Sequence, residues 1–383
     1  MFRSLYDYNF FGKKVLVRCD FNVPVYKGKV LDDFKIIKAL STIKYLRESG
    51  AKIILASHIA QEGRWQKASL RPVVPVLEGI LNEKVLFCPK SIGSKPKRMI
   101  DKMGLGKILV LENLRINKGE ERNDEKFAKE LAALAEIYVG EAFGCCHRKH
   151  SSIVITPKLL PHFIGFECER EANVLSSLIE NPQRPLVVLI GGAKVESKLK
   201  MIARFLPMAD YLLFGGKIAN ILLAIQKIIV GGPKPSQETK DLLLRIDLTN
   251  PKINLPLDVL ASFSEEGIRQ IAPGSVRKEE EILDIGQATI EKFSEIIKIA
   301  KTIFWSGNLG LVEDSNFRNG SLSIARAIIK NEKALKIAGG GDTVAFIRAE
   351  GLEKGFSYLS SGGSALLEFI AKGTLPGIEA LKI

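Results

Sequence analysis

Cysteine is scarce in this 383-residue chain: there are five, an odd number, and Cys145 and Cys146 are adjacent. Such a set does not resemble a disulfide framework, so a reducing compartment fits best and we expect a cytoplasmic protein. The N-terminus lacks an apolar core followed by a small-residue cleavage site, and the chain has no run of about 18 apolar residues. We therefore expect a soluble protein that neither enters nor crosses a membrane.

Blocks of five or six like charges are also missing, although the formal net charge is +13, from 56 Lys and Arg against 43 Asp and Glu. The basic residues are scattered and are not interleaved with aromatic residues, which argues against a nucleic-acid-binding or membrane-binding arm. A positive balance raises the local concentration of anionic partners, and phosphorylated metabolites remain among them. A lysine-rich soluble surface is the simpler explanation of most of the charge.

Two common nucleotide-binding signatures do not occur. The chain contains no Gly-Lys-Ser/Thr of a P-loop, and no G-x-G-x-x-G follows the first predicted strand. Neither a P-loop enzyme nor a dinucleotide-dependent dehydrogenase of the usual type is supported.

The length exceeds what one hydrophobic core usually serves, so we expect two domains, and an apolar fraction of 46% can fill both cores. In the first half, short apolar runs alternate with helical patterns at residues 35–49 and 124–135, which predicts an α/β fold with a parallel sheet. Each run ends in polar residues. The four runs, at residues 14–18, 52–56, 107–111 and 137–139, lead into Asp20-Phe21-Asn22, Ser57-His58, Glu112-Asn113-Leu114-Arg115 and Glu141-Ala142-Phe143-Gly144.

In the second half the predicted strands end in glycine. Residues 186–190, 211–214, 334–338 and 356–360 lead into Gly191-Gly192, Gly215-Gly216, Gly339-Gly340-Gly341 and Ser361-Gly362-Gly363. Ligands of open parallel sheets bind at the carboxyl ends of the strands, so these turns should gather on one edge and suit a polyphosphate. Arg-rich and His-rich turns on the other domain suit a small, doubly anionic molecule, so a phosphate donor would face an anionic acceptor across an interdomain cleft.

The stretch from residue 180 to 198 predicts a hinge, a strand, a phosphate-binding loop and a helix. Pro182 and Pro185 interrupt the preceding helix, and Lys194 and Lys198, four residues apart, can share one face of the following helix. An ordinary strand-to-helix turn with solvated lysines is an equally good interpretation of this stretch alone. Asp342, directly after three glycines, is either a metal-binding carboxylate or a helix N-cap.

Several ordered motifs run from one end of the chain to the other: Arg18-Cys19-Asp20-Phe21-Asn22-Val23-Pro24, Ser57-His58, Glu112-Asn113-Leu114-Arg115, Ala142-Phe143-Gly144, His147-Arg148-Lys149-His150, Gly191-Gly192-Ala193-Lys194-Val195, Trp305, Gly339-Gly340-Gly341-Asp342-Thr343 and Leu375-Pro376-Gly377. Together they resemble the phosphoglycerate kinase family over essentially the whole length. The resemblance implies a cytoplasmic, monomeric enzyme of glycolysis with two Rossmann-like lobes, each a parallel sheet flanked by helices. The implied reaction is reversible phosphoryl transfer between ATP and the carboxylate of 3-phosphoglycerate, giving 1,3-bisphosphoglycerate and ADP, with hinge closure and magnesium.

The resemblance also implies which segments of the chain bind each substrate and which connect the two lobes. Residues 1–168 would form the acid-substrate lobe, with the tail 371–383 packing back on it; residues 169–185 would be the connecting helix and hinge, and residues 186–370 the nucleotide-binding lobe. Carried over by motif, the expected 3-phosphoglycerate ligands are Asp20, Asn22, His58, Arg115 and Arg148. The expected catalytic lysines are Lys35, Lys194 and Lys198, the magnesium ligand is Asp342, and the nucleotide contacts are Gly191, Gly192, Gly215, Gly216, Glu313, Gly340, Gly341 and Thr343.

The chain departs from the family pattern at several of these sites. Lys35 and Gln61 stand where the family has arginines, and a lysine keeps the charge but loses the planar guanidinium. In the nucleotide lobe Ser197 replaces an aspartate, Lys217 and Ser364 replace glycines, and Trp-Asn-Gly-Pro becomes Trp305-Ser306-Gly307-Asn308. These changes motivate two rival hypotheses: a weak or inactive paralogue that acts as a nucleotide-binding regulator, and a kinase for another carboxylic acid.

A cluster of potential metal ligands admits one more interpretation, a zinc site made by Cys145, Cys146, His147 and His150. Adjacent cysteines lack the usual two-residue spacer, and the family motif already accounts for both histidines, so the zinc interpretation is disfavoured.

Overall fold

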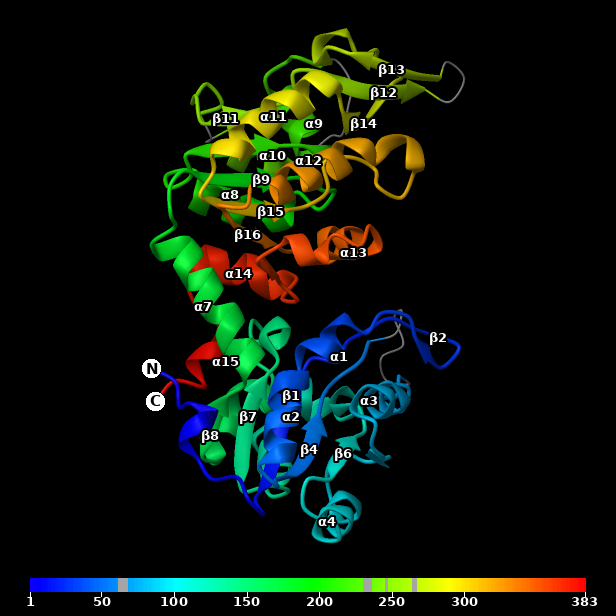
Figure 1. The fold of residues 1–383 in the computed structure, drawn as a ribbon, viewed down its shortest axis with the longest axis vertical. Coiled ribbons are helices and arrows are strands. Elements are labelled where there is room, and N and C mark those ends of the chain that lie inside the picture. Colours follow the sequence, from blue (N-terminus) through cyan, green and yellow to red (C-terminus); the bar gives the residue numbers. More distant parts are fainter. Residues whose placement is uncertain (61–67, 230–235, 245–246, 264–266) are drawn as a thin grey trace. The chain divides into compact units, whose positions relative to one another are not determined.

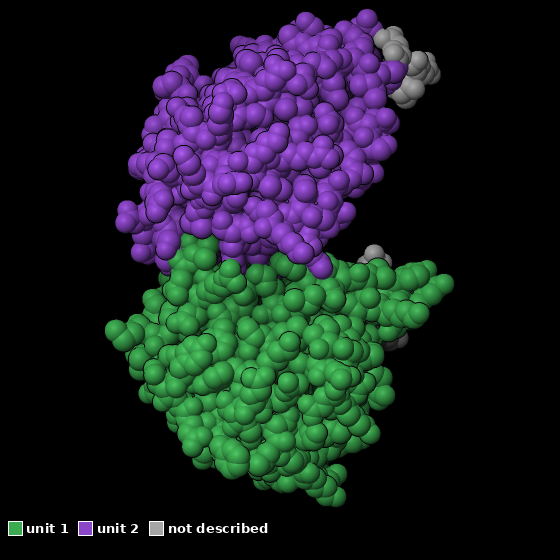
Figure 2. Space-filling view, viewed as in Figure 1, with its two compact units in different colours: residues 1–174, 374–383 green, residues 175–373 purple. Residues whose placement is uncertain are grey.

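The computed structural model describes residues 1–60, 68–229, 236–244, 247–263 and 267–383. The chain divides into two compact units. Unit 1 comprises residues 1–174 and 374–383, and unit 2 comprises residues 175–373 (Figure 2). The boundary falls inside helix α7 (Phe166–Glu180), and the C-terminal segment belongs to unit 1.

Unit 1 is built on a six-stranded sheet in which all neighbouring strands are parallel (Figure 1). In spatial order the strands are β5 (Leu86–Cys88), β6 (Ile108–Leu111), β4 (Lys52–Ala56), β1 (Lys14–Cys19), β7 (Ile137–Glu141) and β8 (His162–Ile164). The central strands are buried along almost their whole length, as expected for a parallel sheet covered on both faces.

The helices of unit 1 are α1 (Phe34–Lys38), α2 (Leu40–Glu48), α3 (Val73–Leu81), α4 (Ser94–Asp101), α5 (Lys118–Glu121), α6 (Glu125–Ala132), the first part of α7, and α15 (Pro376–Glu379). Helix α6 illustrates how the sequence sets a boundary: the Asp124 side chain accepts a hydrogen bond from the Phe127 backbone N–H and caps the helix. The helix predicted over residues 35–49 is present as α1 and α2, which meet at Ala39.

Unit 2 contains a second all-parallel sheet of six strands. In spatial order these are β11 (Ile253–Asn254), β10 (Tyr211–Phe214), β9 (Leu186–Ile190), β15 (Thr302–Ser306), β16 (Leu335–Ala338) and β17 (Tyr358–Leu359). The helices are the second part of α7, α8 (Leu199–Phe205), α9 (Gly216–Ile225), α10 (Gln237–Leu243), α11 (Gln287–Ile299), α12 (Asn319–Lys330), α13 (Gly341–Ala349) and α14 (Ser364–Lys372). The predicted α/β class with two parallel sheets flanked by helices is confirmed.

Two small antiparallel elements were not predicted. Strands β2 (Val25–Tyr26) and β3 (Lys29–Val30) form a hairpin in unit 1. In unit 2, β12 (Val259–Phe263) pairs with β13 (Gly267–Ile271) on one side and β14 (Glu281–Ile285) on the other. This sheet matters for the site below because β14 supplies residues to a pocket.

Trp305 lies in β15 and is fully buried, with Phe346 and Phe356 packed around its ring. It is a core residue, as tryptophan usually is. In the part of the chain that the structure describes, no helix combines the length and apolar character needed to cross a membrane.

Candidate active site

The carboxyl ends of the unit 1 strands carry most of the predicted substrate-binding residues. Asp20 directly follows β1 and His58 follows β4, while Arg115 lies in the 3₁₀ turn Leu114–Ile116 that comes after β6. Because β1, β4 and β6 are parallel neighbours, their carboxyl ends meet at one edge of the sheet. We call Asp20, Asn22, Lys35, His58, Arg115 and Arg148 the acid-site group.

Lys35 and Asp20 form the shortest contact within this group. Lys35 Nζ donates to Asp20 Oδ2 at 2.7 Å, and the Asn22 backbone N–H donates to Asp20 Oδ1 at 3.2 Å. Burial works to raise the pKa of Asp20, but the positive charge of Lys35 and these hydrogen bonds outweigh it and lower the pKa to about 2. The Asn22 side chain is held in turn, because its Oδ1 accepts from the Ala60 N–H at 2.8 Å.

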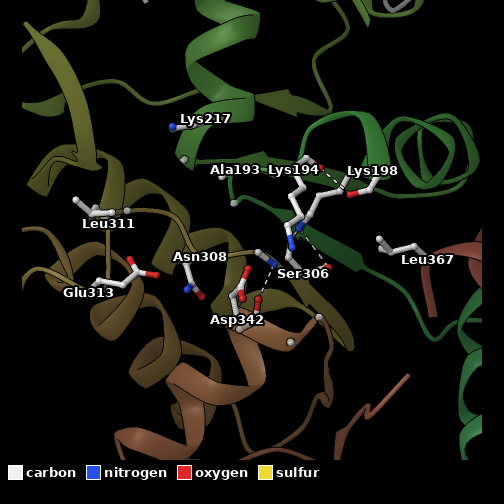
Figure 3. A pocket seen from close by; sticks show the side chains of 18 of the residues that line it. Ala193, Lys194, Lys198, Lys217, Ser306, Asn308, Leu311, Glu313, Asp342 and Leu367 are labelled. Carbon is white, nitrogen blue, oxygen red and sulfur yellow. Dashed lines mark hydrogen bonds between the residues drawn. The ribbon is translucent and has the colours of Figure 1, made fainter. Parts of the chain in front are cut away.

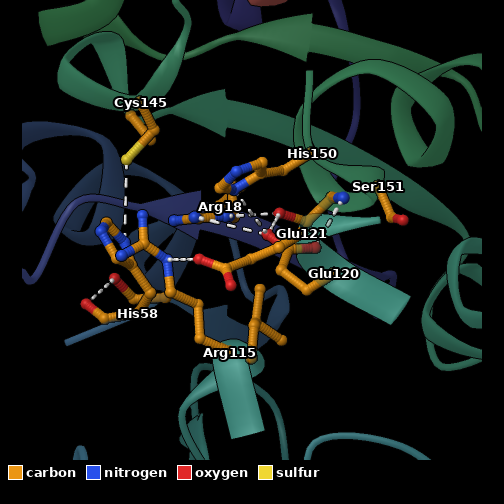
Figure 4. Close-up of polar contacts among 12 residues, drawn as sticks. Arg18, His58, Arg115, Glu120, Glu121, Cys145, His150 and Ser151 are labelled. Atoms are coloured by element: carbon orange, nitrogen blue, oxygen red, sulfur yellow. Dashed lines mark hydrogen bonds and ion pairs between the residues drawn. The ribbon is translucent and has the colours of Figure 1, made fainter. Parts of the chain in front are cut away.

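His58 is 4% exposed, and its imidazole is held neutral by its surroundings. Burial lowers its pKa well below the usual value, and the positive charges of Arg18, Arg115 and Lys35 add to that effect, while Asp20 opposes it. Its Nδ1 lies 3.8 Å from the Cys145 sulfur (Figure 4). A neutral ring can both donate and accept a hydrogen bond, which suits contact with an anionic substrate.

Two guanidinium groups approach one another at this edge. Arg115 is buried, and this burial is the main cause that lowers its pKa. The positive charge of the exposed Arg148 is the next cause and lowers the pKa further. Arg115 Nε lies 3.4 Å from Glu121 Oε1 but has no hydrogen-bond partner among the described residues. Like charges that lack full compensation favour an incoming anion, and guanidinium groups bind carboxylate and phosphate strongly.

A buried network that was not predicted from the sequence lies next to His58 and Arg115 (Figure 4). Arg18 Nε donates to Ser152 Oγ at 2.7 Å, and Ser152 Oγ donates to Glu120 Oε1 at 2.6 Å. Arg18 Nη2 also lies 3.8 Å from Glu120 Oε1, and both side chains are almost fully buried. Arg18 stands in the first family motif, so its sequence position was a usable signal, but the partner more than 100 residues away was not visible in the sequence.

The structure does not support the zinc interpretation. All five cysteines are free and buried. Among the described residues, the side chains whose ligand atoms lie within 4.8 Å of one another are Asp20, His58 and Cys145, not the four adjacent residues of the sequence cluster. Lys35 is already bound to Asp20, and the arginines around His58 would repel a cation.

Unit 2 contains a pocket of about 550 Å³, which we call the unit 2 pocket (Figure 3). Its volume is in the range of small-molecule sites. Predicted residues that line it are Gly192, Lys194, Lys198, Gly216, Glu313, Gly340, Gly341, Asp342 and Thr343. Residues that depart from the family pattern also line it, namely Ser197, Lys217, Ser306, Asn308 and Ser364.

Gly191 and Gly215, predicted as nucleotide contacts, do not line this pocket but allow three turns to pack against its floor. A Cβ on Gly191 would lie 2.2 Å from the Asn308 carbonyl oxygen, and a Cβ on Gly215 would lie 2.6 Å from a Leu309 methyl group. The Gly192 N–H donates to Asn308 O at 2.7 Å, and the Gly216 N–H donates to Leu309 O at 2.9 Å. The missing side chains therefore let the turns after β9, β10 and β15 converge.

Lys198 is 8% exposed and points toward the place where these three turns meet. Its Nζ donates to the Ser306 carbonyl oxygen at 2.6 Å and lies 3.4 Å from Ser306 Oγ. Burial lowers the pKa of Lys198 to about 8, and the carboxylate of Asp342 partly offsets that shift. A desolvated ammonium group with few partners is poised to bind a negatively charged oxygen.

The arrangement of Lys194 and Lys198 differs from the sequence prediction. The two lysines do not share a helix face, because β9 leads into a 3₁₀ turn at Glu196–Lys198 and α8 begins only at Leu199. Lys194 lies before that turn and is exposed, yet both lysines line the same pocket. The connection after β9 therefore continues to Lys198, and the helix begins later than the four-residue spacing of the two lysines had predicted.

Asp342 is not the N-cap of α13. The cap position is Gly340, with φ 102°, and Asp342 lies in the first helical turn with its side chain at the pocket. Thr343 is buried, and its Oγ1 accepts from the Gly307 N–H at 2.7 Å. The first turn of α13 therefore joins the β15 turn to the pocket.

Further lining residues were not identified from the sequence. They are Ala193, Glu281, Ile282, Leu283, Gly307, Gly310, Leu311 and Leu367. The segment Glu281–Leu283 comes from the unpredicted antiparallel sheet, which has no motif to reveal it. Gln61, the second departure from a family arginine, and its neighbours Glu62, Arg64 and Trp65 lie outside the described residues.

Comparisons with known proteins agree with this geometry. The family profile described as phosphoglycerate kinase matches residues 5–372. A phosphoglycerate kinase of Orientia tsutsugamushi (strain Ikeda) is 43% identical over 392 residues, covering 99% of this chain and 97% of the relative. The structure of phosphoglycerate kinase from Coxiella burnetii aligns with a TM-score of 0.86 at 32% identity, covering 100% of this chain and 99% of that chain. That of the Pyrococcus horikoshii OT3 enzyme aligns with a TM-score of 0.89 at 30% identity, covering 100% and 98%.

Proposed function

Because the chain belongs to the phosphoglycerate kinase family, we propose that the acid-site group binds 3-phosphoglycerate and that the unit 2 pocket binds ATP or ADP. The enzyme is a phosphotransferase, and its reaction is reversible phosphoryl transfer between ATP and the carboxylate of 3-phosphoglycerate. The comparisons give no support to a non-catalytic regulator.

The observation that carries the residue assignment is the setting of Lys198. It is a nearly buried ammonium group beside the Gly191–Gly192 turn, in a pocket that also holds Lys194 and Asp342. Phosphoryl transfer needs positioned positive charge on the transferred group more than it needs a covalent intermediate. Lys198 supplies that charge from a nearly buried position, where electrostatic stabilisation is stronger than it is in water.

In unit 1 the proposed roles follow from charge and hydrogen bonding. Arg115 and Arg148 bind the phosphate of 3-phosphoglycerate, since Arg115 Nε is a buried donor without a hydrogen bond among the residues described. Neutral His58 donates or accepts beside them, and Lys35, held by Asp20, stabilises the charge of the reacting carboxylate.

Magnesium fits the unit 2 pocket. Asp342 offers the hard carboxylate oxygen that Mg²⁺ prefers, and it lies near enough to Lys198 to influence that lysine's pKa. A magnesium ion held by Asp342 would neutralise part of the charge on the nucleotide phosphates. Glu313 lines the same pocket and is proposed to accept a hydrogen bond from the ribose.

A coupled assay with 3-phosphoglycerate and magnesium ATP tests the function. We expect turnover that is lost in Lys198→Met, with folding checked by circular dichroism. If the folded wild-type protein shows turnover no higher than the background rate, the proposed function is wrong. The monomeric state, the cytoplasmic location and the hinge closure implied by the resemblance stay predictions.

A further inference from the structure

Asn308 has an unusual combination of burial and missing contacts. It is 6% exposed, and its side-chain oxygen Oδ1 is buried without a hydrogen-bond partner in the described part of the chain. A buried polar atom without a partner costs free energy, so such atoms in folded proteins generally call for an explanation. Asn308 also lines the unit 2 pocket.

Hydrogen bonds fix the backbone around Asn308, the point from which its side chain extends. The Asn308 carbonyl oxygen accepts from the Gly192 N–H at 2.7 Å. On its C-terminal side, the Leu309 N–H donates to Ser321 Oγ at 2.9 Å, and Leu309 O accepts from the Gly216 N–H at 2.9 Å. A backbone that is already ordered loses little further conformational entropy when a ligand binds.

The neighbours of Asn308 in the pocket indicate which part of a ligand it meets. Figure 3 shows its amide projecting into the pocket, in this view between the side chains of Glu313 and Asp342. Glu313 is the proposed ribose acceptor, and Asp342 is the proposed magnesium ligand. The parts of a nucleotide that would come nearest to this position are the ribose, with its 2′ and 3′ hydroxyl groups, and the α-phosphate.

We propose that Asn308 is a nucleotide-binding residue whose side-chain amide hydrogen-bonds to the junction of ribose and α-phosphate. The amide carries both an acceptor and donors: Oδ1 can accept a hydrogen bond from a ribose hydroxyl, and Nδ2 can donate to the oxygens of the α-phosphate. The inference rests on the proposed function, because it takes the unit 2 pocket as the nucleotide site.

The family pattern offers a reason for an amide side chain at position 308. The family pattern has asparagine directly after the tryptophan and proline two residues later, whereas this chain has Ser306 and Asn308. Ser306 faces Lys198, with its Oγ 3.4 Å from Lys198 Nζ. Asn308 thus supplies to the pocket an amide that the serine lacks.

Equilibrium binding of ADP to the full-length protein, measured by calorimetry, tests the proposal without requiring catalysis. We expect Asn308→Ala to weaken ADP and AMP binding by about tenfold or more, the usual effect of losing a hydrogen bond to a charged group. Asn308→Asp keeps the shape but adds negative charge, so it should bind ADP more weakly still. Asn316→Ala, at an exposed asparagine of the same unit, is the matched control and should change nothing.

The possible outcomes test the role of Asn308 and the proposed function of the unit 2 pocket separately. Loss for AMP and ADP but not for adenosine locates the bond on the α-phosphate, and an equal loss for adenosine locates it on the ribose; both support the proposal. Wild-type affinity in Asn308→Ala and Asn308→Asp, or a loss for ADP that AMP does not share, overturns it. If the wild type binds no ADP at all, the proposed function fails together with the inference. A thermal melt and 3-phosphoglycerate binding report whether each variant is folded.

Discussion

Lys35 Nζ donates to Asp20 Oδ2 at 2.7 Å, so the lysine that stands in place of a family arginine is engaged with a second residue of the acid-site group. The contact holds the ammonium group of Lys35 at the carboxyl edge of the unit 1 sheet. It also leaves the ammonium group with fewer donors for a substrate than a guanidinium would have.

Removing Lys35 should make the protein more sensitive to acid. The pKa of Asp20 is lowered to about 2, so its stabilisation is present at neutral pH and is lost as the pH falls through that value. In Lys35→Met the buried carboxylate loses its partner and its pKa rises, so unfolding should begin at higher pH. Circular dichroism across an acid titration measures this, with Lys35→Arg as the charge-preserving control. An unchanged acid midpoint in Lys35→Met would contradict the importance of the pair.

Restoring arginine should raise activity. We expect Lys35→Arg and Gln61→Arg each to increase kcat/KM for 3-phosphoglycerate, by roughly tenfold for a gained charge-assisted contact. The coupled assay measures both variants and their combination. Lys29→Arg, at an exposed position of the β2–β3 hairpin, is the control for a lysine-to-arginine change in itself. If neither variant gains activity, the argument from lost arginines is wrong.

Activity should fall on the alkaline side. Burial lowers the pKa of Lys198 to about 8, with Asp342 opposing, so the free enzyme loses the ammonium charge as the pH rises through that value. The profile of kcat/KM for ATP should therefore decline with an apparent pKa near 8. Lys198→Arg, whose guanidinium stays charged, should move this decline to higher pH even if its maximum is lower. A wild-type profile that stays flat across this range would show that Lys198 titrates elsewhere.

The burial of Lys198 should lower the stability of the folded protein, although the lysine is needed for activity. Because the pKa of Lys198 is lowered from 10.5 to about 8, the unfolded state binds more protons between those values and wild-type stability should rise with pH there. Lys198→Met should raise the melting temperature at pH 7 while activity falls by roughly 100-fold or more. The Ser306 carbonyl oxygen stays satisfied in this variant, since the Gly191 N–H also donates to it. Lys194→Met, at an exposed lysine, should leave the melting temperature nearly unchanged; equal effects of both variants would refute the burial argument.

Asp342 should set the magnesium requirement. Asp342→Asn removes the charged ligand but keeps its shape, so we expect the magnesium concentration for half-maximal activity to rise by about tenfold. The KM for 3-phosphoglycerate should stay close to that of the wild type. Glu353→Gln, at an exposed acidic residue of the same unit, controls for loss of charge. An unaltered magnesium titration in Asp342→Asn would exclude this residue as the ligand.

Much of the fold was predictable because its signals are local. The strands at Lys52–Ala56, Leu186–Ile190 and Tyr211–Phe214 were expected at these bounds, since apolar β-branched runs bounded by polar or glycine turns are typical of buried parallel strands. The β12–β14 sheet escaped prediction because its strands carry no comparable run. Helix α8 began later than expected, because a 3₁₀ turn interrupts the segment between the glycines and Leu199.

The two parallel sheets, the glycine turns and the family could be predicted from the amino-acid sequence, since they follow from local patterns and ordered motifs. Which side chains meet, and how their pKa values shift, depends on the folded arrangement of the chain. Lys198 is desolvated by segments around residue 306, and Asn308 is held by turns more than 90 residues away in the chain. Burial and electrostatic coupling depend on distances between such remote segments, and no local pattern contains them.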